Sequence, residues 1–315
     1  MGYKCMECGK FYVTPTSNYI CNDSSCPGEG LTGLLIEQAN ESGNSSSDQG
    51  GSSQITSSPP PLNVDASIEP AGLCVLLMDA SGSMSWSAFD TPPIERRRLV
   101  ANAAARGIFD LRNMTQKSNA YICAIRFDHT QHLMFVKTVE QIINEYNNST
   151  TFAEYLYDEI KSMEGGTDIN SALKMAASFV EKFLNGTVPG MESKMPMYHN
   201  QFSPILNKTI DVPNVRILLY TDGEQYAKLG SIVNPLSNHE PDLLMGAFIG
   251  QTHEKGCNEL RQVVGNCPIH GSEQFFVLDK PEKIATLRGL FRMASGTTGF
   301  CPNCIESSTI VPNYD

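Results

Sequence analysis

The stretch Leu73-Cys74-Val75-Leu76-Leu77-Met78-Asp79-Ala80-Ser81-Gly82-Ser83 decides the fold of this chain. Its first six residues form an unbroken apolar run of strand length, which is typical of a central parallel strand buried on both faces. A second run of this kind, residues 215–220, leads into Thr221 and Asp222. Both strands therefore end in side chains that carry oxygen.

Helical patterns alternate with strand patterns along the chain. We expect helices at 94–114, 139–147, 152–161, 169–184, 258–264 and 282–293, and further strands at 120–127, 131–136, 243–249 and 274–278. This alternation predicts a doubly wound, mostly parallel α/β sheet flanked by helices, in which ligands bind at the carboxyl ends of the strands. Residues 185–211 have little periodicity, and we interpret them as an insertion that is either functional or mobile.

Oxygen-bearing side chains occur in three separate loops of this pattern. Asp79, Ser81 and Ser83 follow the first strand, Thr167 precedes a helix, and Asp222 follows the second apolar run. Two carboxylates and three hydroxyls are the ligands that Mg²⁺ prefers, and Mn²⁺ or Ca²⁺ would also accept them. If the loops converge, they hold a divalent cation with one coordination position open to an outside group.

These motifs, Asp-x-Ser-x-Ser, a distant Thr and a distant Asp, resemble the metal-ion-dependent adhesion site (MIDAS) of von Willebrand factor A (VWA) domains. The resemblance covers residues 69–296. It implies that Ser81, Ser83 and either Thr167 or Asp222 bind Mg²⁺ directly, whereas Asp79 and the remaining group act mostly through water. A partner's Asp or Glu would then complete the coordination shell.

Within this family, residues 290–295 and the Cys-rich knuckles resemble bacterial TerY-type proteins, which are linked to stress responses and to a kinase and a phosphatase. In that subgroup the metal-binding part lies at the C-terminus rather than the N-terminus. Other A domains of this kind scaffold ATPases, transcription factors or ubiquitin receptors, and the sequence does not separate these. The resemblance therefore implies a protein-interaction scaffold, with a kinase, phosphatase or ATPase as partner. Trp86, close after Ser83, is a candidate aromatic anchor for that partner, or else a side chain packed on the rim of the sheet.

Two other classes of function remain as alternatives. An Asp after the first strand also occurs in Mg²⁺-dependent phosphoryl-transfer enzymes, but the position of their general acid is Ser81 here, and no histidine is tied in sequence to Ser81 or Ser83 as a base. We therefore expect binding rather than catalysis. The other alternative is a thiol or zinc redox sensor that uses Cys301 and Cys304.

Four cysteines at the N-terminus have the spacing of a structural zinc site. Cys5 and Cys8 form a tight knuckle, and Cys21 and Cys26 follow twelve residues later. We expect a zinc ribbon with these four thiolate ligands at 1–36, with two disulfides or unpaired thiols as the alternatives. Residues 37–68 are rich in Ser, Gly and Pro, which predicts a flexible linker.

A second Cys-rich group lies toward the C-terminus. Cys301 and Cys304 form a knuckle in the tail 297–315, and Cys257, Cys267 and His270 lie upstream. Four of these five residues could hold a second Zn²⁺. Alternatively, Cys301 and Cys304 are redox-active, complete a site with one N-terminal pair, or bind nothing.

Composition bounds the remaining possibilities. The net charge of −11 disfavours nonspecific binding to nucleic acid or to an anionic membrane. The basic run at residues 96–98 is expected on a solvated helix face. No apolar segment approaches transmembrane length and none resembles a secretory signal, so we expect a cytoplasmic protein.

Overall fold

The computed structural model describes residues 2–5, 11–12, 35–38, 69–90, 93–114, 117–161, 165–188, 194–196, 198–223, 227–238, 241–251, 253–295, 301 and 303–304. Most of the expected linker lies outside these residues, as do Cys8, Cys21 and Cys26 of the expected zinc ribbon. Cys5 ends strand β1 (Gly2–Cys5), which pairs antiparallel with β2 (Phe11–Tyr12) and with β3 (Leu35–Gln38).

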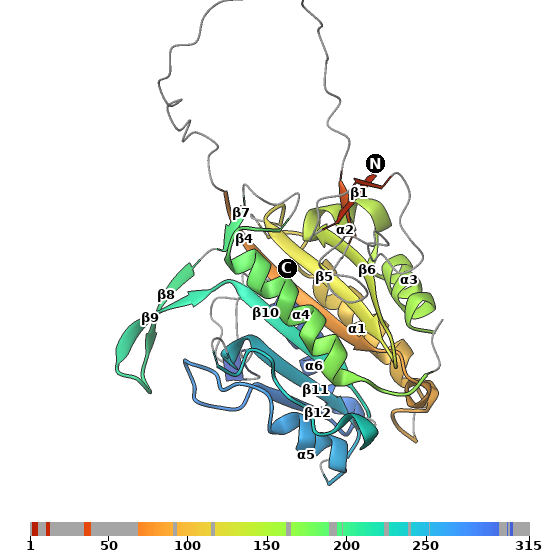
Figure 1. The fold of residues 1–315 in the computed structure, drawn as a ribbon. Coiled ribbons are helices and arrows are strands. Elements are labelled where there is room, and N and C mark those ends of the chain that lie inside the picture. Colours follow the sequence, from red (N-terminus) through yellow and green to blue (C-terminus); the bar gives the residue numbers. More distant parts are fainter. Residues whose placement is uncertain are drawn as a thin grey trace, which may run out of the picture.

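The main sheet has the strand order β12-β11-β10-β4-β5-β6 (Figure 1). These strands are β4 (Glu69–Asp79), β5 (Ala120–Phe127), β6 (Gln131–Thr138), β10 (Val215–Thr221), β11 (Leu244–Ile249) and β12 (Phe275–Leu278). All neighbours pair in parallel except β5 and β6, which form an antiparallel hairpin. If these six strands are renumbered 1 to 6 in chain order and read from β6 to β12, their order is 3-2-1-4-5-6, which is that of a doubly wound fold. The expected fold class is therefore confirmed.

Helices cover both faces of this sheet (Figure 1). They are α1 (Arg96–Phe109), α2 (Val139–Tyr146), α3 (Ser149–Lys161), α4 (Ile169–Leu184), α5 (Lys255–Arg261) and α6 (Ile284–Ser295). Alternate residues of β4 serve the two layers, because successive strand side chains point to opposite faces. Leu76 and Met78 pack in one cluster with residues of α1, α3 and α6, whereas Val75 and Leu77 pack in another with residues of α4 and α5.

The adjacent strands β4 and β10 mark the point where the chain direction across the sheet reverses. After β4 the chain continues to β5 on one side, and after β10 it continues to β11 on the other. The loops that leave these two strands therefore diverge, and in doubly wound sheets ligands bind at this point, outside the carboxyl ends of the strands. Asp79 and Asp222 lie at this switch point.

The segment expected as an insertion contains regular structure. β7 (Lys194–Pro196) pairs in parallel with the start of β4, and β8 (Tyr198–Ser203) forms an antiparallel hairpin with β9 (Lys208–Pro213) that extends away from the main sheet (Figure 1). Most described side chains of this hairpin are exposed, including Phe202, Ile205 and Leu206. An exposed hairpin needs no alternation of apolar and polar residues, so the usual strand pattern is missing.

Helix boundaries differ from expectation by a few residues. α1 ends at Phe109, and the chain then turns, so the expected helix at 94–114 is too long. α5 begins and ends three residues earlier than predicted. No helix within the described ranges is long and apolar enough to cross a membrane.

Candidate metal centre

Asp79 is the last residue of β4, and its carboxylate is buried and fixed from both sides. Its Oδ1 accepts a hydrogen bond from the backbone N–H of Ser81 at 2.8 Å, and its Oδ2 accepts one from Thr221 Oγ1 at 2.5 Å. The bond from Ser81 forms an Asx-turn, in which an Asp side chain accepts a hydrogen bond from the backbone N–H two residues later. Thr221 ends β10, so this carboxylate joins the ends of the two central strands.

The second carboxylate, Asp222, bonds to the serine-rich loop. Ser83 Oγ donates to Asp222 Oδ1 at 2.8 Å, and Ser83 Oγ lies 3.2 Å from Ser81 Oγ. Asp79, Ser81, Ser83 and Asp222 thus meet at the switch point, although Asp79 ends β4 and Asp222 follows β10. Asp222 and Ser81 are both buried.

Thr167 reaches the same corner from the loop before α4. A Cβ added at Gly223 would lie 3.2 Å from Thr167 Oγ1 and 3.7 Å from Asp79 Oδ2, so the threonine hydroxyl and the carboxylate border one small space. The loop is fixed there because Gly82 N–H donates to the carbonyl of Gly165 at 3.2 Å. The structure therefore brings all five oxygen-bearing residues of the expected site to one edge of the sheet.

Asp128, in the turn between β5 and β6, holds the Thr167 loop from behind. Its Oδ2 accepts a hydrogen bond from Gly165 N–H at 3.0 Å, and its backbone carbonyl accepts one from Asp168 N–H at 2.8 Å. Asp168 in turn caps α4 by accepting a hydrogen bond from Ser171 N–H at 3.0 Å. A Cβ added at Gly165 would collide with the buried Asp128 carboxylate as well as with the exposed His129 ring, so a larger residue there would disturb this turn.

The two carboxylates give this corner a high density of negative charge. Burial raises the pKa of Asp79 above its ordinary value, and the neighbouring charge of Asp222 raises it further. The hydrogen bonds from Ser81 and Thr221 oppose this shift. A cation at this corner would favour the ionised form of Asp79, because it offsets both unfavourable effects.

Arg96 supplies one positive charge at the site. Its Nη1 forms an ion pair with Asp222 Oδ2, and its guanidinium carbon lies 5.9 Å from the centre of the Trp86 ring. Trp86 itself is 65% exposed, so it stands on the rim of the site with its ring open to solvent. It is not packed into the rim of the sheet.

The basic run at residues 96–98 corrects one expectation, because it is not a uniformly solvated helix face. Arg97 is buried and pairs with Glu95 at 2.5 Å, and Arg98 pairs with Glu154 at 2.6 Å. Positive charge at the N-terminus of α1 opposes the helix dipole, and these acidic partners compensate for it.

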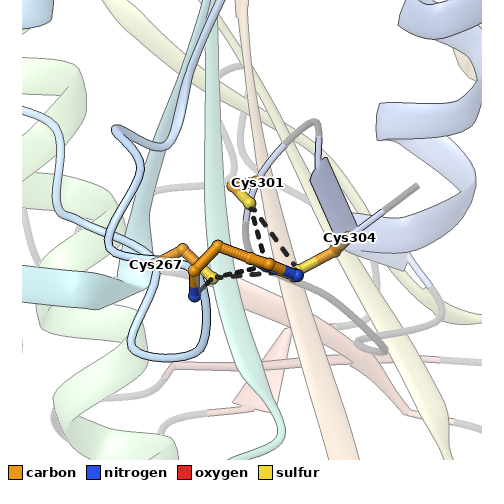
Figure 2. A group of neighbouring side chains, drawn as sticks. Cys267, Cys301 and Cys304 are labelled. Carbon is orange, nitrogen blue, oxygen red and sulfur yellow. Dashed lines mark hydrogen bonds between the residues drawn. The ribbon is translucent and has the colours of Figure 1, made fainter. Parts of the chain in front are cut away.

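A second cluster of potential ligands lies away from the switch point. Cys267, His270, Cys301 and Cys304 each offer one ligand atom, and these four atoms lie within 4.8 Å of one another. Figure 2 shows the three thiols turned toward a common centre. Cys257 does not join them, since it lies on α5 and packs in the core beneath β10 and β11.

Three residues that shape the switch-point site, Thr221, Arg96 and Asp128, were not assigned to it from the sequence. A signal for Thr221 was its position directly before Asp222, at the end of the strand that pairs with β4. Asp128 follows a strand in the same way as Asp79 does. No sequence signal indicated that Arg96 would turn inward.

No family profile and no curated protein sequence matches the chain. Among solved structures, it is similar to a von Willebrand factor type A protein from Catenulispora acidiphila, at 15% identity and a TM-score of 0.41, over 72% of this chain and 43% of that chain. It is also similar to proximal thread matrix protein 1 from the mussel byssus, at 14% identity and a TM-score of 0.43, over 72% of this chain and 47% of that chain. BatB from Bacteroides thetaiotaomicron matches at 13% identity and a TM-score of 0.40, over 72% of this chain and 98% of that chain.

The chain spans less than half the length of the first solved chains that it matches. At these identities and TM-scores the similarity carries no argument about the fold, which rests on the strand order alone.

Proposed function

We propose that this chain is a protein-interaction module that binds an acidic side chain of a partner through a divalent cation, preferably Mg²⁺, held at the switch point. The observation that carries this proposal is the convergence of Asp79, Ser81, Ser83, Thr167 and Asp222 from three separate loops. Ligand binding at this position is the general behaviour of doubly wound sheets.

The donor set fits a hard cation. Every candidate ligand atom is an oxygen, and no thiol or imidazole is part of the set, which favours Mg²⁺, Mn²⁺ or Ca²⁺ over zinc. Two buried carboxylates so close together also repel each other, and a divalent cation removes that cost. The donors therefore suit the ion that the resemblance to VWA domains implies.

This chain's own residues prepare the site for the ion. Thr221 and the Ser81 amide orient the Asp79 carboxylate, and Asp128 holds the loop that carries Thr167. The two carboxylates balance the charge of a bound divalent cation, and Arg96 adds one positive charge, so the occupied site would keep an attraction for one more anion. The bound ion would supply the attraction for a partner's Asp or Glu.

Trp86 is the proposed residue of this chain that anchors the partner. Exposed aromatic side chains at the centre of an interface contribute much of its binding energy, and the Trp86 ring is open to solvent beside Arg96. The resemblance to TerY-type proteins suggests a kinase, phosphatase or ATPase of a stress-response complex as the partner.

The test is capture of partners from native lysate by the immobilised full chain, with Mg²⁺ or with a chelator. Wild type is compared with Asp79→Asn, and with Asp158→Asn as a control that neutralises an exposed aspartate of α3. We expect a partner that is retained only with Mg²⁺, by wild type and by the control. If circular dichroism shows that Asp79→Asn is folded and all samples capture the same set of proteins, the proposal is contradicted.

The same variants separate binding from catalysis. Ser83 Oγ donates to Asp222 and lies beside Ser81 Oγ, and within the described residues no histidine forms a hydrogen bond with either hydroxyl. We therefore expect no release of phosphate from a generic aryl phosphate. Hydrolysis by wild type that is lost in Asp79→Asn would establish a phosphoryl-transfer enzyme instead.

A further inference from the structure

We propose that Cys267, His270, Cys301 and Cys304 bind a structural Zn²⁺ ion, which ties the C-terminal knuckle to the loop before β12 and supports the β8–β9 hairpin. This site is independent of the switch-point site, because it shares no residue with it and uses sulfur and nitrogen rather than oxygen. It remains valid whether or not the chain binds partners through a cation.

Five of the six distances between the four atoms match the edges of a zinc tetrahedron, and the sixth, between Cys267 Sγ and Cys301 Sγ, is within 4.8 Å. With Zn–S about 2.3 Å and Zn–N about 2.0–2.1 Å, sulfur atoms should lie about 3.8 Å apart and sulfur should lie about 3.6 Å from nitrogen. Cys304 Sγ lies 3.8 Å from Cys267 Sγ and 3.7 Å from Cys301 Sγ. His270 Nδ1 lies 3.5, 3.6 and 3.4 Å from the sulfurs of Cys267, Cys301 and Cys304.

Hydrogen bonds to the sulfur atoms surround this group. His270 N–H donates to Cys267 Sγ at 3.4 Å, and Ser272 Oγ donates to Cys301 Sγ at 3.2 Å. Bonds of this kind orient metal ligands and stabilise thiolates. The loop turns tightly at Gly271, where a φ of +67° allows its N–H to bond to the Cys267 carbonyl at 2.8 Å.

The charge around the cluster suits a zinc centre with three thiolates. Such a centre, with one neutral histidine, carries one net negative charge, and burying it calls for a compensating cation. Arg216 is a candidate for that cation: it is 1% exposed, and negative charge on Cys74, which lies outside the cluster, and on Cys304 and Cys267 would raise its pKa. Its Nη1 is held in place by the backbone carbonyls of Pro213 and Val215.

The ligand count points to a structural role. Four protein ligands complete a tetrahedron and leave no position for water or substrate, which distinguishes structural from catalytic zinc. Cys267 and Cys301 are buried and pack against Val212 of β9. A closed site beneath a strand is suited to hold chain segments together.

The segment held in this way is the β8–β9 hairpin. Ser203, at the end of β8, donates to the carbonyl of Pro268 at 2.6 Å, and the Ile205 side chain lies so close to Gly271 that an added Cβ would meet it at 2.7 Å. An isolated two-stranded hairpin is marginally stable in water. The loop from Cys267 to Gly271 therefore acts as its base, and zinc would fix the shape of that loop.

The experiment measures the number of zinc ions per chain by elemental mass spectrometry, on full-length protein purified under reducing conditions. A background variant, Cys5→Ser with Cys8→Ser, removes half of the N-terminal thiols that could hold another ion. In this background we expect about one zinc per chain. Cys304→Ser should lose it, whereas Cys257→Ser, which alters a buried thiol outside the cluster, should keep it. A background without zinc, or equal zinc in Cys304→Ser and Cys257→Ser, would overturn the proposal.

Spectroscopy and exchange keep the test decisive if Cys304→Ser folds poorly. Co²⁺ added to metal-free background protein should give the intense visible absorption of a tetrahedral ion with thiolate ligands. Removing the metal should then speed amide hydrogen exchange in residues 198–213 while leaving β4 and β10 unchanged. Octahedral cobalt spectra, or equal exchange with and without metal, would rule out a structural zinc at this site.

Discussion

The ion pair between Arg96 and Asp222 predicts that Arg96→Gln binds divalent cations more tightly than wild type. In the metal-free chain the Arg96 guanidinium neutralises Asp222, one of the proposed ligands. A cation must either displace the guanidinium or bind next to its positive charge. Both routes weaken cation binding, so the sign of the effect is the same for each.

The magnitude follows from what the pair contributes. A hydrogen bond between charged, mostly buried groups contributes about 1.5–3 kcal/mol, and Arg96 and Asp222 have side-chain exposures of 16% and 0%. Since each 1.4 kcal/mol is a factor of ten, Arg96→Gln should raise the affinity roughly 10- to 100-fold. The same change should destabilise the metal-free protein by about 1–3 kcal/mol, because two carboxylates then lack their cation.

Calorimetric titration of chelator-treated protein with Mg²⁺ and with Mn²⁺ measures the affinity, and thermal melts in chelator measure the stability. Arg98→Gln is the matched control, because it removes the same charge from the same helix turn but from a partly exposed pair with Glu154. The reasoning is refuted if Arg96→Gln binds the cations no more tightly than Arg98→Gln.

Two further predictions follow from burial. Because burial and Asp222 raise the pKa of Asp79, protonated Asp79 stabilises the metal-free fold at low pH, and this contribution is lost as pH rises through the raised pKa. The increase in Tm caused by Mg²⁺ should therefore grow between about pH 5 and pH 8, and a constant increase across melts in this range would argue against a cation on Asp79. Gly107 of α1 packs against α6, where an added Cβ would lie 2.7 Å from the Arg288 carbonyl and from Phe291 Cβ. Overpacking of about 1–3 kcal/mol should outweigh the helix propensity gain of about 0.5–1 kcal/mol, so Gly107→Ala should lower the urea midpoint; a midpoint at or above that of wild type would contradict close packing of the two helices.

Local sequence patterns were sufficient for the central fold because each buried strand reads as an apolar run. β4 and β10 were recognisable in this way, and the oxygen-bearing residues at their ends indicated where the two strands meet. α4 was predicted with both of its ends, at residues 169 and 184.

Features that depend on contacts between distant segments were not predictable. The inward turn of Arg96 depends on Asp222, which lies 126 residues away in sequence. Cys257 could not be separated from Cys267 by spacing, because only the packing of α5 against β11 turns its thiol into the core. Most side chains of β8 are polar and most of the hairpin is exposed, so its strands could not be told from a loop.

The hydrogen bond between Thr221 and Asp79 joins residues 142 positions apart, and the exposed tip of the β8–β9 hairpin lies between them in sequence. A single cut at that tip would place the two carboxylates on separate polypeptides, neither of which carries both. Cation affinity at the switch point would then report directly on reassembly of the two pieces. The chain could in this way serve as a split sensor, in which recovery of Mg²⁺ binding marks the moment when the halves come together.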